Sequence, residues 1–584
     1  MIIEKINSPK DLKSLTTKEL TILCDEIREV LLTKLSEHGG HIASNLGIVE
    51  LTAALHYVFN SPIDKIVFDV SHQSYVHKIL TGRKESFLEK DKYDDVSGYS
   101  APSESEHDLF ILGHTSTSLS LACGLAKARD LKGEKYNIIA VIGDGSLSGG
   151  EAYEGLNNIA QSDTNTIVIV NDNEMSIAEN HGGLYQNLQD LRESNGKCEY
   201  NFFKALGLEY HYIEEGNDVA KLISALSEIK DSKKPVVLHV HTLKGKGYNY
   251  AEKDKEKWHW GLPFDLKTGE SKVQVPVDYN ELTANYLLKK IKQDSNVVVI
   301  TSGTPSASAF TKKRREEAGA QFVDVGIAEE HAIAYASGIS KNGAKAIYPV
   351  YSSFVQRTYD QISQDLCINN SPAVLIIFAG SVYGLNDVTH LGLYDITMMS
   401  NIPNLVYLAP TCKEEYFAML DYAISQKEHP IAIKVPGGGV ISREIAECDY
   451  SKTNKFEITH QGEKVAILAL GTFYHLGEQI LDELSKHGLN ATLVNPKFIT
   501  GIDKELLEKL KSNHELVITI EDGILEGGFG EKITSFYGTS KILVKNYGIK
   551  KSFPDRFVAE ELLRENGISL EQITADILTL LNIK

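Results

Sequence analysis

Short apolar runs alternate with stretches of helical spacing along most of the chain. Each run is rich in Val, Ile and Leu and is followed by glycine or polar residues, which is the pattern of a buried strand. The runs are NIIAVIG (137–143), TIVIVND (166–172), PVVLHVHT (235–242), VVVITSG (297–303), AVLIIFAG (373–380), VAILALG (465–471) and ELVITIEDG (515–523). Strands that alternate with helices form mainly parallel sheets. The pattern therefore predicts an α/β fold of doubly wound domains with mainly parallel sheets.

The same pattern divides the chain into three blocks. A polar, irregular stretch, FDLKTGESKVQVPVDYNELT (264–283), interrupts the alternation and is interpreted as a linker. A second interruption follows the glycines of KVPGGGVISRE (434–444). We therefore expect three domains, at 1–265, 277–440 and 455–584.

Composition narrows the classes of protein and of partner. The chain has 584 residues and a formal net charge of −19, so it has room for several domains and is poorly suited to bind nucleic acid. The negative net charge does not exclude an anionic small ligand, because local hydrogen-bond donors or a metal ion can outweigh it. No apolar run reaches the roughly eighteen residues of a membrane span, and the six cysteines are scattered. We expect a cytoplasmic protein with reduced thiols and no membrane partner.

An aspartate lies between two glycines where the first of these strands is expected to end. The segment 141–160 reads VIGDGSLSGGEAYEGLNNIA, in which a strand stops at Gly143 and a helix follows. Gly143 and Gly145 permit a tight turn and the close approach of a ligand to the backbone. Asp144 would then lie at the carboxyl end of a parallel strand, where open α/β sheets bind ligands. Taken alone, the motif favours an ordinary strand-to-helix turn with a capping aspartate.

The next predicted strand ends in a second group of oxygen ligands. It continues as NDNEMSI (171–177), one strand–helix unit after Asp144. The Asp144 carboxylate, the Asn173 amide oxygen and the Met175 carbonyl are hard ligands of the kind that Mg²⁺ or Ca²⁺ prefers, with phosphate oxygens in the remaining positions. The two motifs together indicate a metal-bound diphosphate.

Motifs along nearly the whole chain resemble those of the 1-deoxy-D-xylulose-5-phosphate synthase family, in the transketolase superfamily. The matching segments are HGGHIASNLGIVELTAALHYVF, FDVSHQSYVHKILTGR, SGYSAPSESEHD, LGHTSTSLS, GDGSLSGG, NDNEMSIAEN, KGKGYNYAEKD, DVGIAEEHA, VYSSFVQRTYDQ and THLGLYDI. The resemblance implies thiamine diphosphate and Mg²⁺ as cofactors and a homodimer. It also implies a diphosphate-binding domain (1–265), a pyrimidine-binding domain (277–440) and a transketolase C-terminal-like domain (455–584).

The implied reaction joins pyruvate, with loss of CO₂, to glyceraldehyde 3-phosphate, and its product feeds isoprenoid, thiamine and pyridoxal biosynthesis. The cofactor supplies the electron sink and the protein orients it. By resemblance, Glu329 bonds the pyrimidine ring and promotes loss of the thiazolium C2 proton, with Glu330 as the alternative. The implied site residues are, for catalysis, Glu329, His41, His259 and His390; for the metal, Asp144, Asn173 and Met175; for the cofactor, His72, His114, Ser116, Thr117, Gly143, Gly145, Ile177, Lys244 and Phe354; and for the substrate, Tyr351, Arg357 and Asn386.

Each of these residues also has an ordinary structural interpretation. Two glutamates at a helix start more often complement the helix dipole than catalyse. Phe354, expected to stack on the pyrimidine, and Ile177, expected to bend the cofactor, would otherwise be assigned to the core, and Lys244 to the solvated surface. A single histidine is more often structural, but five in matching motifs favour proton transfer near neutral pH.

Two positions depart from the family pattern where the acceptor phosphate is expected. The family's DRAG is IFAG here and its YPRG is VPGG, so Phe378 and Gly437 replace two arginines. Bidentate arginine contacts favour a phosphorylated ligand, so their loss predicts a weaker preference for glyceraldehyde 3-phosphate. Lys434, Arg357 or a displaced Arg443 could compensate.

Three further departures lie near the expected acceptor. The family's GADGQTH is GLNDVTH, so Asn386 replaces a carboxylate and Asp387 follows it. The PKR after SGF is SAP, which removes cations near Ala101 and Pro102. After ENHGGL the chain is shorter than the family pattern, and the shorter segment is expected to alter access to the site.

Four functions are therefore weighed. The first is the family's own reaction, and the second is a transketolase-like enzyme with a different, unphosphorylated acceptor. The third is a scaffold that retains a cofactor-binding relic, which the intact Asp144, Asn173 and Glu329 oppose. The fourth is a dinucleotide-binding oxidoreductase, which lacks its G-x-G-x-x-G signature in the first β–α–β unit.

Overall fold

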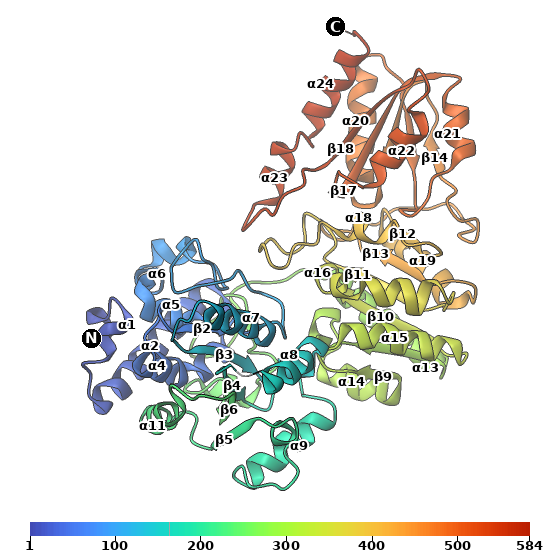
Figure 1. Cartoon of the computed structure of the whole chain (residues 1–584). Coiled ribbons are helices and arrows are strands. Elements are labelled where there is room, and N and C mark those ends of the chain that lie inside the picture. Colours follow the sequence, from blue (N-terminus) through green and yellow to red (C-terminus); the bar gives the residue numbers. More distant parts are fainter. Residues whose placement is uncertain (163, 584) are drawn as a thin grey trace. The chain divides into compact units, whose positions relative to one another are not determined.

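The computed structural model describes residues 1–162 and 164–583, which form two compact units (Figure 1). The first unit comprises residues 1–276 together with 325–328. The second comprises residues 277–324 and 329–584. The first unit is built on one large sheet and the second on two.

A five-stranded parallel sheet forms the centre of the first unit. Its strands lie in the order β2–β3–β4–β6–β5. The register of β3 on β4 pairs Gly143 with Asn171, which places the GDG and NDN motifs at neighbouring strand ends. The bounds are β2 Lys65–Phe68, β3 Ile138–Gly143, β4 Ile167–Asp172, β5 Glu209–Ile213 and β6 Val236–His241.

Helices cover both faces of this sheet, because successive residues of a strand point to opposite faces. Along β3, Ile139 and Val141 pack with α2, α4 and α11, whereas Ala140 and Ile142 pack with α7, α8 and α9. These helices are α2 Thr17–His38, α4 Val49–Val58, α7 Ser118–Leu131, α8 Gly150–Gln161, α9 Gly183–Glu193 and α11 Val219–Ile229. A short antiparallel pair, β1 (Gly40–His41) with β7 (Trp260–Gly261), sets His41 opposite Trp260.

The second unit contains a six-stranded parallel sheet in the order β12–β13–β11–β10–β8–β9. Leu287 of α13 and Met419 of α19 lie in the core on one of its faces. The strands are β8 Val297–Thr301, β9 Phe322–Asp324, β10 Lys345–Tyr351, β11 Val374–Phe378, β12 Val406–Leu408 and β13 Ile431–Lys434. The helices are α13 Tyr279–Gln293, α15 Glu329–Lys341, α16 Ser352–Val355, α18 Asp395–Met399 and α19 Lys413–Ser425.

The remaining sheet has the order β14–β16–β15–β17–β18, in which only β14 is antiparallel to its neighbour. Its core combines Ile467 and Ile518 with Ile480 of α20 and Ile577 of α24. The bounds are β14 Glu457–His460, β15 Lys464–Ala469, β16 Thr492–Asn495, β17 His514–Ile524, β18 Leu543–Ile549, α20 Tyr474–Lys486, α22 Phe529–Tyr537 and α24 Leu570–Leu580.

The predicted fold class is confirmed, because all seven apolar runs form strands and the sheets are mainly parallel. The linker interpretation of 264–283 is wrong at its end, since α13 begins at Tyr279, where the Asp278 side chain accepts a hydrogen bond from the Glu281 N–H. Across residues 1–162 and 164–583, we find no helix with the length and apolarity to cross a membrane. The six cysteines are free thiols.

Candidate functional site

Asp144 lies directly after β3 and is buried, with 1% of its surface exposed. Its Oδ2 accepts a hydrogen bond from Asn180 Nδ2 at 2.7 Å, and its backbone N–H donates to Asn171 O at 3.2 Å. Burial and the nearby charge of Asp172 raise the pKa of Asp144 well above its usual range. A buried carboxylate with so little compensation is a favourable place for a cation.

The NDN motif separates into one buried anchor and a loop beside Asp144. Asp172 is fully buried, and its Oδ2 lies 2.8 Å from His239 Nε2. In the loop, Asn173 Oδ1 accepts from the Met175 N–H at 3.3 Å, and the Asn173 N–H is hydrogen-bonded to the Asp144 carboxylate. The structure thus brings the three predicted metal residues together and assigns Asp172 to the scaffold.

The two glycines of the GDG motif have different surroundings. Neither has a positive φ, so the turn does not require the left-handed conformation. A Cβ at Gly145 would lie 2.9 Å from Ser176 Cα, so glycine is needed for the loop after Asn173 to pack against the turn. Around a Cβ at Gly143, no other described heavy atom lies within 4 Å, and the backbone there is open to a ligand.

Asp69 organises the loop that carries Ser116 and Thr117. Its buried carboxylate accepts from the Ser116 N–H at 2.8 Å and from the Ser118 N–H at 3.0 Å. The Ser116 hydroxyl donates to Ser146 O at 2.8 Å, which ties this loop and the nearby half-buried His114 to the GDG turn. Sequence reasoning missed Asp69, although it is the aspartate of the matched FDVSHQ segment.

Three of the predicted histidines form one cluster in the first unit. The ring centroids of His41 and His72 are 5.1 Å apart, and His259 lies 5.7 and 5.2 Å from them. Lys244 is 1% exposed, donates to Ser176 O, and places Nζ 3.2 Å from His259 Nδ1, so it is not a solvated surface lysine. Desolvation and the charge of Lys244 lower the pKa of His259 well below its usual range, which keeps this imidazole neutral.

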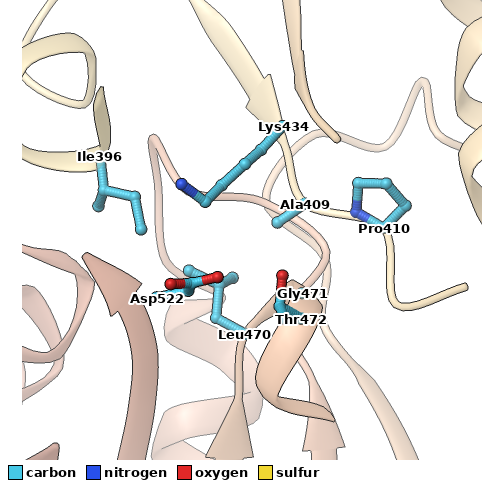
Figure 2. A pocket seen from close by; sticks show the side chains of 8 residues that line it. All are labelled: Ile396, Ala409, Pro410, Lys434, Leu470, Gly471, Thr472 and Asp522. Carbon is cyan, nitrogen blue, oxygen red and sulfur yellow. The ribbon is translucent and has the colours of Figure 1, made fainter. Parts of the chain in front are cut away.

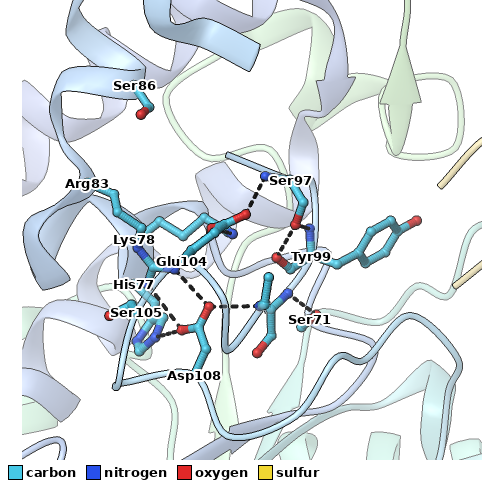
Figure 3. Close-up of polar contacts among 12 residues, drawn as sticks. Ser71, His77, Lys78, Arg83, Ser86, Ser97, Tyr99, Glu104, Ser105 and Asp108 are labelled. Carbon is cyan, nitrogen blue, oxygen red and sulfur yellow. Dashed lines mark hydrogen bonds and ion pairs between the residues drawn. The ribbon is translucent and has the colours of Figure 1, made fainter. Parts of the chain in front are cut away.

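Tyr99 extends the histidine cluster, and buried ion pairs fix the segment that carries it. Its ring packs edge-on against His41, with centroids 5.7 Å apart. Figure 3 shows the Tyr99 ring pointing away from the network around Asp108, where Arg83 Nη1 lies 2.7 Å from Asp108 Oδ2. The Ala101 N–H donates to the same oxygen at 2.9 Å. The segment that lacks the family's cations is therefore held by internal charges.

Glu329 is the first residue of α15 and is 3% exposed. Arg357 Nη1 lies 3.5 Å from its Oε2. Burial outweighs the charge of Arg357 and raises the pKa of Glu329 to about 7. Glu330 is only half-buried. Of the two glutamates, Glu329 is thus the one whose surroundings keep a proton near neutral pH.

Three predicted residues form an aromatic group in the second unit. Phe354 in α16 lies 5.6 Å from the ring of Tyr351, at the end of β10, and 5.7 Å from the ring of His390. Burial raises the pKa of Tyr351 to about 12, so its phenol stays protonated. The structure therefore places Phe354, predicted to stack on the cofactor, beside Tyr351 and His390, which are predicted to contact the substrate and to transfer protons. Half-buried Ile177, in the first unit, follows the loop of Asn173 and Met175.

Asn386 is exposed and engaged elsewhere. Its Nδ2 donates to Phe557 O at 3.0 Å, and the Arg556 N–H donates to Asn386 O at 2.7 Å. Asp387, by contrast, accepts from the Thr389 hydroxyl at 2.6 Å. Asn386 therefore ties the segment before His390 to the C-terminal region.

The two arginine replacements are accommodated by local packing. Phe378 belongs to β11 and is buried in the core of the six-stranded sheet. A Cβ at Gly437 would lie 2.1 Å from Ser381 Oγ, so the Ser381 side chain occupies the space of a larger residue there.

The cations that could compensate already have partners. Lys434 is 4% exposed, and its Nζ lies 2.7 Å from Asp395 Oδ2. The Lys434 and Asp522 side chains line a small cavity (Figure 2), and its volume is about 10 Å³. Arg443 Nη1 lies 2.7 Å from Glu478 Oε1, and the guanidinium stacks over Tyr474 at 4.9 Å. In this structure neither side chain replaces the missing arginines.

Family models match most of the chain. The model described as 1-deoxy-D-xylulose-5-phosphate synthase matches residues 3–201 and 194–242. The transketolase pyrimidine binding domain matches 275–438, and the transketolase C-terminal domain matches 454–573.

Relatives named 1-deoxy-D-xylulose-5-phosphate synthase are similar along their whole length. One from Caldanaerobacter subterraneus subsp. tengcongensis is 39% identical over a 620-residue alignment that covers 99% of this chain and 99% of the relative. Another, from Alkaliphilus oremlandii, is 40% identical over 620 residues and covers 98% of each chain. The chain therefore belongs to the 1-deoxy-D-xylulose-5-phosphate synthase family.

Proposed function

We propose that this chain joins pyruvate, with loss of CO₂, to glyceraldehyde 3-phosphate and so forms 1-deoxy-D-xylulose 5-phosphate, using thiamine diphosphate and Mg²⁺. The observation that carries the proposal is the similarity to synthases of this name over 98–99% of both chains. The buried Asp144 and the buried Glu329 support it, because they meet the two chemical needs of the cofactor, a cation for its diphosphate and an acid for its pyrimidine.

The residues at the ends of β3 and β4 fit a diphosphate-bound cation. Asp144, Asn173 and the Met175 carbonyl would hold it. Asn180 Oδ1 and Ser176 Oγ are buried in the same loop and have no hydrogen-bond partner among the described residues, so donors and acceptors remain for a ligand. Within residues 1–162 and 164–583, no group of three His, Cys, Asp or Glu side chains is placed to hold a metal. The proposed ligands are instead one carboxylate, one amide and one carbonyl.

Different side chains of this protein would then hold protons and orient the ligands. Bound thiamine diphosphate supplies the electron sink that decarboxylation requires. Glu329 holds a proton near neutral pH, and Phe354 offers an apolar face for a ring. His259 is kept neutral, and His41 and His72 line the same cluster.

We further propose that the active form is a cytoplasmic homodimer. The support is the superfamily resemblance for the dimer and six free cysteines for a reducing compartment.

One incubation tests the reaction. The full chain with Mg²⁺, thiamine diphosphate, pyruvate and glyceraldehyde 3-phosphate should release CO₂ and form a product with the mass of 1-deoxy-D-xylulose 5-phosphate. A panel of other aldehydes serves as the comparison. If CO₂ is released but the phosphorylated aldehyde is not consumed, the acceptor is wrong, and if no CO₂ is released, the proposed reaction fails.

The second function, an enzyme for an unphosphorylated acceptor, is not favoured. It rests on Phe378 and Gly437, whereas the similarity to named synthases extends along the whole chain.

A further inference from the structure

Helix α9 follows the loop of Asn173 and Met175 and lies just before the point where the match to the synthase family model is divided into two pieces. The two matched pieces of that model meet at 194–201, directly after α9 ends at Glu193. The shorter segment expected there thus contains an ordered helix. Leu188 and Leu191 are fully buried and share a core with Val170 of β4 and Leu147 of the GDG turn. Thus α9 is docked on both strand-end regions.

The first turn of α9 reaches the turn that carries Asp144. The Tyr185 hydroxyl lies 3.2 Å from Asp144 O and 3.1 Å from Gly145 O, and it donates to this pair of carbonyls. Asn180, just before the helix, donates to the Asp144 carboxylate at 2.7 Å. The backbone and the carboxylate of Asp144 are therefore both held from one short segment.

The last turn of α9 holds the second motif. Arg192 Nη1 lies 2.5 Å from Asp172 Oδ2, and the two side chains are 15% and 0% exposed. The other carboxylate oxygen of Asp172 accepts from the Glu174 N–H at 3.0 Å, which shapes the loop between Asn173 and Met175. One helix therefore bonds to the turn that carries Asp144 and to Asp172, which in turn holds the loop that supplies the other proposed ligands.

We infer that Tyr185 and Arg192 are positioning residues for the metal site, and that α9 clamps the GDG turn to the NDN loop. This inference rests on the proposed function, because it concerns the same cation. Mg²⁺ demands near-ideal octahedral geometry, whereas Ca²⁺ tolerates irregular sites. Loosening the clamp should therefore weaken Mg²⁺ binding more than Ca²⁺ binding, whereas a purely structural role for α9 predicts no such selectivity.

The test is calorimetric titration of Mg²⁺, and separately of Ca²⁺, into the full chain with saturating thiamine diphosphate. Tyr185→Phe removes only the hydroxyl. Its Kd for Mg²⁺ should rise about three- to tenfold, as expected for one lost hydrogen bond, with a smaller rise for Ca²⁺. Tyr200→Phe is the matched control, because Tyr200 is 77% exposed and lies beyond α9, and it should bind both ions like the wild type.

A second pair of variants tests the other end of the helix. Arg192→Met leaves Asp172 with one fewer charged partner and should also weaken Mg²⁺ selectively, while Arg192→Lys should recover part of the affinity. If Arg192→Met does not fold, Tyr185→Phe decides.

Two failures can be told apart. If Tyr185→Phe binds Mg²⁺ with the wild-type Kd and the wild-type Mg²⁺/Ca²⁺ ratio, α9 is merely structural and the inference is wrong. If the wild-type chain binds no Mg²⁺ in the presence of thiamine diphosphate, the proposed function itself is wrong.

Discussion

Nη1 of Arg357 lies 3.5 Å from Oε2 of Glu329, and yet burial keeps the pKa of Glu329 raised to about 7. The guanidinium favours the ionised carboxylate, and desolvation disfavours it more strongly. A substantial fraction of Glu329 is therefore protonated at neutral pH. This is the form that can donate a hydrogen bond to the pyrimidine of the proposed cofactor.

Glu329→Gln should slow exchange of the cofactor's C2 proton by roughly a hundredfold or more, since a positioned proton-transfer group is lost while the size is kept. Hydrogen–deuterium exchange at C2 of bound thiamine diphosphate, followed by NMR, measures this rate. Glu330→Gln is the matched control and should exchange like the wild type. The reverse pattern would transfer the role to Glu330.

Arg357→Met should move the pH dependence of C2 exchange. Removing the cation favours neutral Glu329, so its pKa rises above about 7, by about one unit. If the protonated form is the active one, the alkaline limb of the profile moves to higher pH. If Arg357→Met still binds the cofactor but the alkaline limb of its pH profile does not move, the group that titrates in C2 exchange is not Glu329.

Asp144→Asn should weaken metal-dependent cofactor binding while stabilising the cofactor-free protein. Loss of the charged ligand weakens thiamine diphosphate binding in Mg²⁺ by roughly a hundredfold or more. The raised pKa of Asp144 means that the folded state holds a proton which the unfolded state releases above about pH 4, so wild-type stability falls as the pH rises from there.

The cofactor-free variant should therefore melt at least about 2 °C above the wild type at pH 7, and the gain should disappear near pH 4. Calorimetric binding and thermal melts at the two pH values check both halves. Unchanged cofactor affinity would remove Asp144 from the metal site.

Mixing inactive Asp144→Ala and Glu329→Gln proteins tests the homodimer. If one cofactor is served by Asp144 of one chain and Glu329 of its partner, each heterodimer contains about one intact site, and activity returns after subunit exchange. Native mass spectrometry of the mixture verifies the exchange. Verified heterodimers without activity would mean that each site is built from a single chain.

Lys434→Met should destabilise the second unit by about 3–5 kcal/mol, because it leaves the buried Asp395 and Asp522 without their cation. Denaturant unfolding measures the loss. Adding Asp395→Asn to Lys434→Met should recover part of it. Lys413→Met, which removes a partly exposed pair with Glu414, should change stability by less than about 1 kcal/mol.

Several features of the protein are determined by the sequence alone. Apolar runs bounded by glycine and polar residues form strands because a strand of a parallel sheet is covered by helices on both faces, so nearly all of its side chains are apolar. Consecutive parallel strands end at the same edge of a sheet, so the order of the motifs was sufficient to place Asp144 beside Asn173 and Met175. The matching motifs likewise identify the family without coordinates.

Other features were decided only by the tertiary structure. Asp172 and Asn173 are adjacent in one motif and look alike as candidate ligands in the sequence. In the structure, Asp172 is bonded to Arg192 and His239, so it has a structural role. Asp69 was missed for the same reason, since its partners at Ser116 and Ser118 lie far along the chain.

The protonation of the candidate acid and base groups also needed the fold. Burial lets Glu329 keep its proton despite the nearby charge of Arg357, and burial together with the charge of Lys244 keeps His259 neutral. A pKa depends on the dielectric surroundings and on charges within a few ångströms, and folding assembles both from segments that are remote in sequence. The motifs therefore determine which groups are present, and packing determines the protonation state in which they act.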